Sequence, residues 1–258
     1  MGRYISEEFP QALKSRLSRF YMIGIVGLCV LANIAVIGFR LIYGKNEGTF
    51  TYNVIEYATW CFVIPYYTCI LIADIAFGGT LREAELSFKR QGAGMSRTAF
   101  YFSKLILSIL LALVYLVITS VVLIFITELF HYTDEPVRFS YIRDFFEKLL
   151  CAVPLWLAGI GMGNMFLFLF PDKRKAYLYY LGLTVLLERG IMLLAMEPFQ
   201  LAPFRALRTL TVTQQFSLIP YPADPARNIP LTIFLGFLYL ILSTAIGLYF
   251  WRRRDQED

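Results

Sequence analysis

The sequence has few charged side chains and few of the residues that metal and acid–base sites require. Only 17% of its 258 residues are charged and only one is a histidine, His131, whereas a soluble domain is about a quarter charged. The four cysteines lie in apolar segments without CxxC or metal-finger spacing, and we interpret them as small hydrophobic residues. No GxxxxGK[ST] phosphate loop, HExxH motif or internal repeat is evident. We therefore expect no catalytic, cofactor or metal site on this chain.

Long apolar runs dominate instead. Hydrophobic residues make up 58% of the chain, and its mean hydropathy is +0.59. A transmembrane helix needs about 20 mostly apolar residues, and the first run is too long for a signal core, so we expect it to remain as an anchor. The sequence predicts an all-α integral membrane protein, a single transmembrane domain over 1–258, with six transmembrane helices at 20–43, 53–77, 99–130, 145–170, 176–196 and 230–251.

Basic residues predict how these spans are oriented. Fifteen of the 24 lysines and arginines fall before the first span, between the second and third or at the start of the third, between the fourth and fifth, and after the sixth. Because cytoplasmic loops carry the excess of such residues, we expect a multi-pass protein of the plasma membrane with both termini in the cytoplasm.

The segment before the first span is amphipathic. One helical face carries its apolar residues, Phe9, Leu13, Leu17 and Phe20. Lysines and arginines lie off that face. This pattern is typical of an interfacial helix, here within 1–19, that feeds the first span. The alternative is an ordinary positively charged flank.

Within the spans, a few residues stand out against the apolar background. Glu188 and Arg189 interrupt the fifth span, and intramembrane charges often mark function. Either one of them faces a translocation path or a neighbouring helix, or both reach water near a span end. Asp74, close to the end of the second span, is expected to snorkel or to cap that end. Gly159 and Gly163 form a small-xxx-small face for close helix contact, within the chain or between chains.

Three further features concern proline, aromatic residues and the segment 197–229. Pro154 would kink the fourth span or mark its effective start. Tryptophans and tyrosines, Tyr66 and Tyr67 among them, are interpreted as interface or packing residues. The segment 197–229 mixes prolines with recurring apolar residues, which predicts one or two short helices dipping into the outer leaflet.

The loop 78–98 is the most informative non-spanning segment. Gly78 and Gly79 end the second span, and Thr80 followed by Glu83 fits a capping box. A short helix over 80–91 then places Leu81, Ala84 and Phe88 on one face. It is either a solvated connector or a docking element for a cytoplasmic partner, with charged side chains setting the register and apolar ones making the contact.

This loop, LREAELSFKRQGAGMSRTAFYFSKL over 81–105, resembles the loop between the second and third spans of type-2 ABC transporter permeases. In that family an arginine-containing short helix is followed by a Gly-x-Ser-Arg-like turn and a lysine early in the third span. The comparable positions here are Arg82, Gly94, Ser96, Arg97 and Lys104. The six spans, the amphipathic first helix and the apolar outer segment fit the family as well.

The resemblance implies a function. The short helix would be the coupling helix that docks on an ATPase subunit, through Leu81, Arg82, Glu83, Glu85, Phe88, Lys89 and Arg97. ATP and Mg²⁺ would bind that separate chain, and a second permease chain, identical or different, would complete the unit. The chain would then be the permease of an ABC exporter for a hydrophobic or amphipathic cargo such as a peptide, a lipid-linked molecule or a drug.

Two other functions compete. A secondary transporter or channel without an ATPase would use midplane ionisable residues, for which only Glu188 and Arg189 are candidates. An intramembrane enzyme would need paired aspartates, a Ser–His pair or a metal motif. His131 at the end of the third span and Asp74 alone do not supply these.

Overall fold

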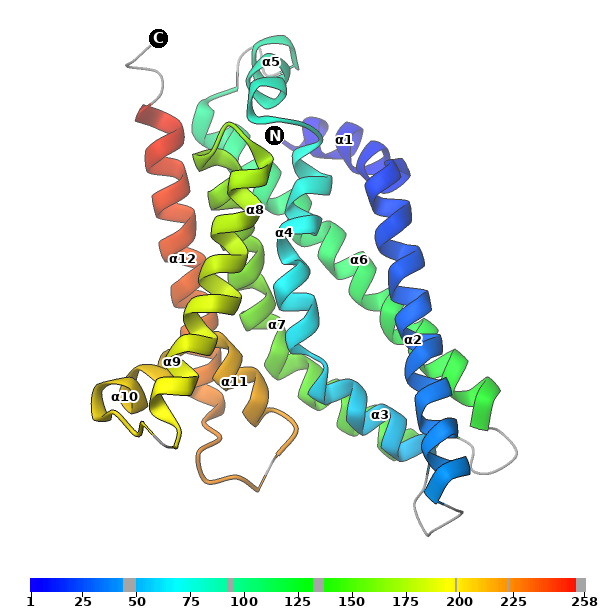
Figure 1. Ribbon diagram of the computed structural model, residues 1–258. Coiled ribbons are helices and arrows are strands. Elements are labelled where there is room, and N and C mark those ends of the chain that lie inside the picture. The colour runs from blue at the N-terminus through cyan, green and yellow to red at the C-terminus, as the bar shows by residue number, and fades with distance from the viewer. Residues whose placement is uncertain (44–49, 92–94, 132–136, 198, 222, 254–258) are drawn as a thin grey trace.

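The computed structural model describes residues 1–43, 50–91, 95–131, 137–197, 199–221 and 223–253, although a few side chains in these ranges, Arg82 and Lys89 among them, are not described. Every regular element in these ranges is helical (Figure 1). A π-helical turn, Gly182–Leu187, joins the helix Lys173–Leu181 to the helix Glu188–Ala195. The α-helices are α1 Gly2–Lys14, α2 Arg16–Tyr43, α3 Phe50–Trp60, α4 Val63–Phe77, α5 Leu81–Gln91, α6 Arg97–His131, α7 Phe139–Leu169, α8 Lys173–Leu181, α9 Glu188–Ala195, α10 Ala202–Leu210, α11 Val212–Leu218 and α12 Ile229–Arg253.

Five stretches are long and apolar enough to cross a membrane. Helices α3 and α4 form a bent pair, and if that pair counts as one span the number of candidate spans is six. They are α2, α6, α7, the continuous stretch Lys173–Ala195 and α12. We call Lys173–Ala195 the α8–α9 column. The all-α class and the spans expected from the sequence are therefore confirmed, with shifted ends: α7 begins at Phe139, so that Pro154 lies inside it and does not mark its start.

The second expected span is two helices and not one straight helix. Asn53–Trp60 and Val63–Phe77 meet at an angle of 59°. Pro65 explains the break, because proline has no N–H to bond the carbonyl of Cys61 and its ring collides with that carbonyl in a continuous helix. The chain turns at Cys61 and Phe62, after which α4 runs into the centre of the molecule (Figure 1).

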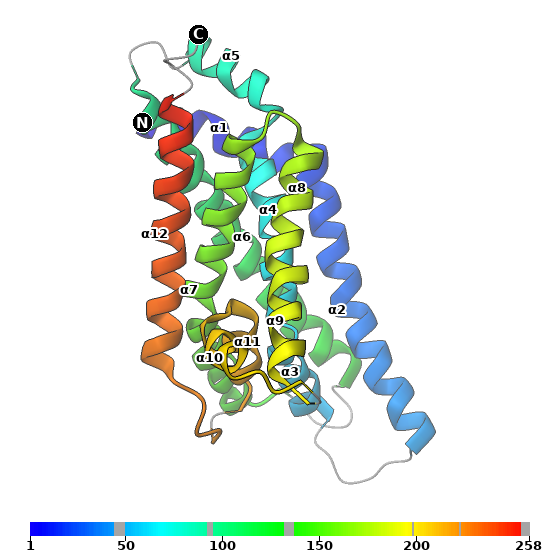
Figure 2. The same ribbon diagram turned by 60° about the vertical axis from the view of Figure 1, so that its left-hand side comes forward.

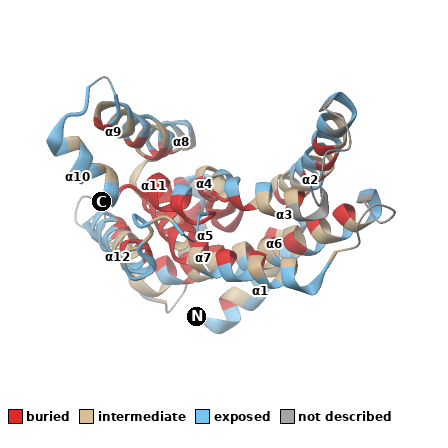
Figure 3. Ribbon diagram, turned by 90° about the horizontal axis from the view of Figure 1, so that it is seen from below, coloured by how far each residue is buried: buried red, intermediate tan, exposed pale blue. Residues whose placement is uncertain are grey.

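Helix α7 forms the centre of the bundle. In its most apolar window 83% of the residues are buried, against 17–28% in the other single-helix spans. The burial colouring in Figure 3 shows the same contrast. Gly159 lies against Tyr66 and Cys69 of α4, Gly163 against Ile70 and Ala73 of the same helix. The small-residue face therefore makes its contact within the chain.

The α1 helix departs from the expected interfacial helix. It ends at Lys14 and α2 begins at Arg16, so the amphipathic segment is split at Ser15. Phe9, Leu13 and Leu17 pack against a cluster on α4 and α6 that includes Ile72 and Leu107. The apolar face is used for contact with the protein, whereas Phe20, expected on that face, is exposed.

The N-terminus, the end of α12 and basic segments gather at one end of the bundle. The N-terminus, α5, the start of α8 and the end of α12 lie together there (Figures 1 and 2). We call it the α5 end, and the opposite end, which carries α3 and α10, the α10 end. The loops that the sequence grouped by their lysines and arginines thus share one side of the molecule.

At the α10 end the segment after α9 forms two short helices, as expected. The first, α10, has no buried residue. The second, α11, is tucked into the bundle: Thr213, Gln215 and Phe216 are among its buried residues. Gln215 accepts a hydrogen bond from the Thr232 hydroxyl at 2.7 Å and donates one to the Thr209 carbonyl at 2.7 Å. The polar groups of the Gln215 side chain therefore have partners within the protein, as buried polar groups require.

Candidate functional site

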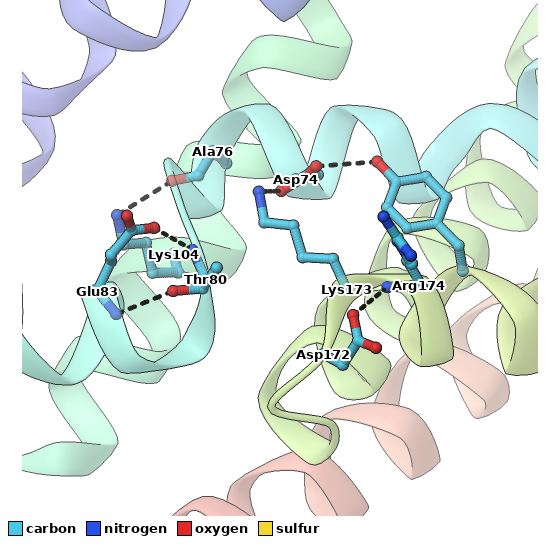
Figure 4. Close-up of polar contacts among 9 residues, drawn as sticks. Asp74, Ala76, Thr80, Glu83, Lys104, Asp172, Lys173 and Arg174 are labelled. Carbon is cyan, nitrogen blue, oxygen red and sulfur yellow. Dashed lines mark hydrogen bonds and ion pairs between the residues drawn. The ribbon is translucent and has the colours of Figure 1, made fainter.

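The candidate site is the root of α5, where that helix leaves the bundle. Gly78 ends α4 with a φ of 76°, a left-handed conformation that glycine adopts without strain. The Thr80 N–H donates to the Glu83 carboxylate, and the Glu83 N–H donates to the Thr80 hydroxyl at 3.3 Å, which is the predicted capping box (Figure 4). The hydrogen bond from the Thr80 backbone is the largest cause that lowers the pKa of Glu83, and the nearby positive charge of Lys173 adds to it. The start of α5 is therefore fixed relative to α4.

The apolar face of α5 points towards its own chain. Leu81 and Ala84 are buried, and the Phe88 ring packs at 5.4 Å from that of Phe100, between ring centroids. Glu83 and Leu86 are exposed. The face that the sequence suggested for a partner thus attaches α5 to the bundle, and a partner would meet the opposite face. The side chains of Arg82 and Lys89, and Gly94, lie outside the described residues.

Arg97 joins the start of α6 to the end of α12. Its guanidinium donates to the Trp251 carbonyl at 3.2 Å and lies 5.0 Å from the centroid of the Trp251 ring. The indole N–H of Trp251 donates in return to the Arg97 carbonyl at 3.1 Å. Because the Arg97 guanidinium also lies 5.9 Å from the Phe88 ring, it holds α5 and α12 to the same point. In this arrangement Arg97 is a structural link between helices, and its predicted contact with an ATPase stays a prediction.

Lys104 is buried, with 2% of its surface exposed. Its ammonium group donates to the Ala76 carbonyl in the last turn of α4 at 3.1 Å and to the Glu8 carboxylate of α1 at 3.4 Å. A buried charge requires such partners. One lysine thus fastens α1, α4 and α6 together directly below the root of α5 (Figure 4).

Asp74 lies on the other side of the same root and holds α8. Its carboxylate forms an ion pair with Lys173 at 2.5 Å and accepts a hydrogen bond from the Tyr177 hydroxyl at 2.9 Å. Asp74 is 7% exposed. The expectation that it snorkels or caps its span is therefore wrong: it is a buried member of an interhelical contact, shown in Figure 4.

Glu188 is buried near the α10 end and contacts two other helices. Its carboxylate accepts hydrogen bonds from the Tyr66 hydroxyl of α4 at 2.9 Å and from the Thr213 N–H of α11 at 2.8 Å. The adjacent Arg189 donates to the Tyr67 hydroxyl at 3.3 Å. Neighbouring residues of α9 thus bind neighbouring tyrosines of α4. Glu188 faces other helices, which is one of the two arrangements that the sequence left open.

Sequence reasoning missed the partners of these charges. Lys173 was counted only as an orientation signal, and Tyr66 only as an interface or packing residue. The signal that could have found them is a polar stripe on an apolar span: Lys173, Tyr177, Tyr180, Thr184 and Glu188 recur every three or four residues. In the described ranges, no three His, Cys, Asp or Glu side chains are placed so that they could hold a metal ion.

No protein-family model and no curated protein matches the chain. The sequence and structure support a coarser class, a helical multi-pass membrane protein with five or six candidate spans.

Proposed function

We propose that this chain is the membrane-spanning permease subunit of an ATP-driven transporter, and that α5 is the surface on which a separate ATPase subunit docks. The observation that carries the proposal is the form of α5. It is a short helix outside the spans, capped at Thr80, held to the bundle by its apolar face, with Glu83 and Leu86 exposed on the other side. A solvated connector needs none of these attachments.

The rest of the unit follows from the family that the loop resembles. ATP and Mg²⁺ bind the ATPase chain, and a second permease chain, identical or different, completes the pathway. The α5 end then lies in the cytoplasm of a plasma-membrane protein, where ATP is available. The cargo is hydrophobic or amphipathic and is exported, which suits spans that expose many large apolar side chains, Leu41, Phe125 and Leu186 among them.

A secondary transporter or channel is the second candidate, and Glu188 favours it. Buried ionisable residues inside spans mark ion or proton pathways in such proteins. Here, however, both carboxylate oxygens of Glu188 are bound by neutral donors of α4 and α11. The hydrogen bonds satisfy the carboxylate as part of helix packing, which supports the first candidate.

The test is a mild-detergent pull-down of the tagged chain from its native cells, with mass spectrometry of the proteins that accompany it. We expect a stoichiometric ATPase subunit carrying a phosphate loop. The variant Leu86→Arg, on the exposed face of α5, should lose that subunit. Ser6→Arg, exposed on α1 at the same end, is the control and should retain it. A chain recovered without any ATPase would favour the secondary transporter and leave α5 as a connector.

A further inference from the structure

The α8–α9 column is fastened to α4 by polar contacts along its whole length. At the α5 end these are the Lys173 ion pair and the Tyr177 hydrogen bond to Asp74. In the middle the Tyr180 hydroxyl donates to the Tyr66 carbonyl at 2.5 Å. At the α10 end Glu188 and Arg189 bind the hydroxyls of Tyr66 and Tyr67. We call this series the polar ladder.

Close packing contributes less to this attachment. Only 22% of the column's most apolar window is buried, and Leu178, Leu186 and Leu193 are more than 60% exposed. Figure 3 shows the column at the edge of the bundle, with exposed residues on its outer side, while Tyr180 on its inner side packs at 6.4 Å from the Phe166 ring of α7, between ring centroids. Gly182 and Gly190 have open space where a side chain would be, unlike the glycines that seal α7 against α4. Membrane helices associate through close packing and hydrogen bonds, and the polar ladder makes hydrogen bonds a large part of the contact between the column and α4.

The ladder begins in the last turn of α4, directly before the short loop that leads to α5. Gly78, the cap of α4, donates its N–H to the Asp74 carbonyl at 3.0 Å, while the Asp74 carboxylate holds Lys173 and Tyr177. Only Gly78, Gly79 and Thr80 separate the end of α4 from the first residue of α5. A displacement of α5 therefore acts on the last turn of α4, and Asp74 is the point in that turn to which the column is tied.

We infer that the Asp74–Lys173 ion pair transmits displacement of α5 to the α8–α9 column, so that Asp74 and Lys173 are positioning residues for transport. The inference rests on the proposed function, because it needs an ATPase that moves α5. On the opposite side of the root, Lys104 ties α4 to α1 and α6. A displacement of α5 therefore acts on the column through the ion pair and the hydrogen bonds of the polar ladder.

The experiment uses the assembled permease and ATPase, purified together and reconstituted in lipid vesicles. Asp74→Asn and Lys173→Gln are compared with Arg174→Gln, which removes a neighbouring exposed charge from the same helix start. We expect both ladder variants to keep the ATPase bound, with the KM for ATP unchanged. Transport and its coupled ATP turnover should fall about fivefold or more, a usual size for coupling between sites. The charge-exchanged chain, Asp74→Lys with Lys173→Asp, should recover much of this loss.

Every other outcome either supports or overturns the inference that the Asp74–Lys173 ion pair transmits the displacement of α5. Folded ladder variants that transport as well as Arg174→Gln would overturn the inference while leaving the permease proposal intact. If neither single variant accumulates, the exchanged chain decides: folded and coupled supports the inference, folded and uncoupled overturns it. Of the two, Lys173→Gln is the more disruptive, because it leaves the buried Asp74 without its ion-pair partner, whereas Lys173 is 32% exposed. Failure of all three to fold would show the pair to be a folding requirement only and would also overturn it. Failure of the natural chain to capture any ATPase rejects the proposed function itself.

Discussion

Glycine positions decide how closely α12 approaches α7. A Cβ built on Gly236 would lie 2.5 Å from the backbone carbon of Pro154, and one on Gly161 would lie 2.6 Å from the Ser243 hydroxyl. Real Cβ atoms do not come that close to other heavy atoms, so either backbones or side chains would have to move. Gly24 on α2, by contrast, has open space at the same position.

We predict that Gly236→Ala destabilises the protein by about 1–3 kcal/mol, the usual cost of overpacking. The collision is with the backbone of a proline, which cannot rotate away. Gly24→Ala is the control and should be neutral or stabilising by about 0.5–1 kcal/mol, because alanine is the better helix former. Thermal unfolding of the two variants in detergent measures the difference. Equal melting temperatures would contradict the α7–α12 contact.

Local residue pairs were predictable from the sequence and distant ones were not. The capping box of Thr80 and Glu83 depends on a spacing of three residues, so the sequence contains all the information. The partners Asp74 and Lys173 are 99 positions apart in the chain, and only the packing of α4 against α8 brings them together. The same holds for Tyr66 and Glu188.

At the scale of elements, hydropathy predicted where the long helices lie. It did not predict where a helix breaks or which neighbour its apolar face contacts. The runs now seen as α6 and α12 were predicted almost to their ends. The bend between α3 and α4 was missed, since an apolar run reads the same on both sides of Cys61. The sequence showed that α1 and α5 each have an apolar face, but it could not show which surface that face contacts. In the structure both faces contact the rest of the protein.

Three elements meet at Glu188, so its loss should loosen α11 from α4 and α9. We predict that Glu188→Ala lowers the free energy of unfolding by about 1–3 kcal/mol, because the buried Thr213 N–H and Tyr66 hydroxyl lose their acceptor. Glu197→Ala, an exposed carboxylate two residues beyond the end of α9, is the matched control and should change little. Chemical unfolding followed by tryptophan fluorescence provides the comparison. Similar effects of the two variants would count against the buried network.

At the scale of the whole molecule, charge bias predicted which segments share a side. We expect epitopes fused to the N-terminus and after Asp258 to be protected or digested together when sealed vesicles are treated with protease. An epitope inserted after Ala223, in the segment between α11 and α12, should behave oppositely. Digestion of only one terminal epitope would contradict an even number of spans and would require the α3–α4 pair to be a re-entrant loop.

The central position of α7 has a consequence for how the protein is made. When α7 leaves the ribosome, the bilayer already holds α2, the α3–α4 pair and α6. The face of α7 that carries Gly161 remains open until α12, the last helix, arrives. Between those events Gly161 and Met165 face lipid instead of protein. A chain stopped before Ile229 would keep this surface permanently uncovered, and a cellular quality-control protease would encounter it as an unfinished product.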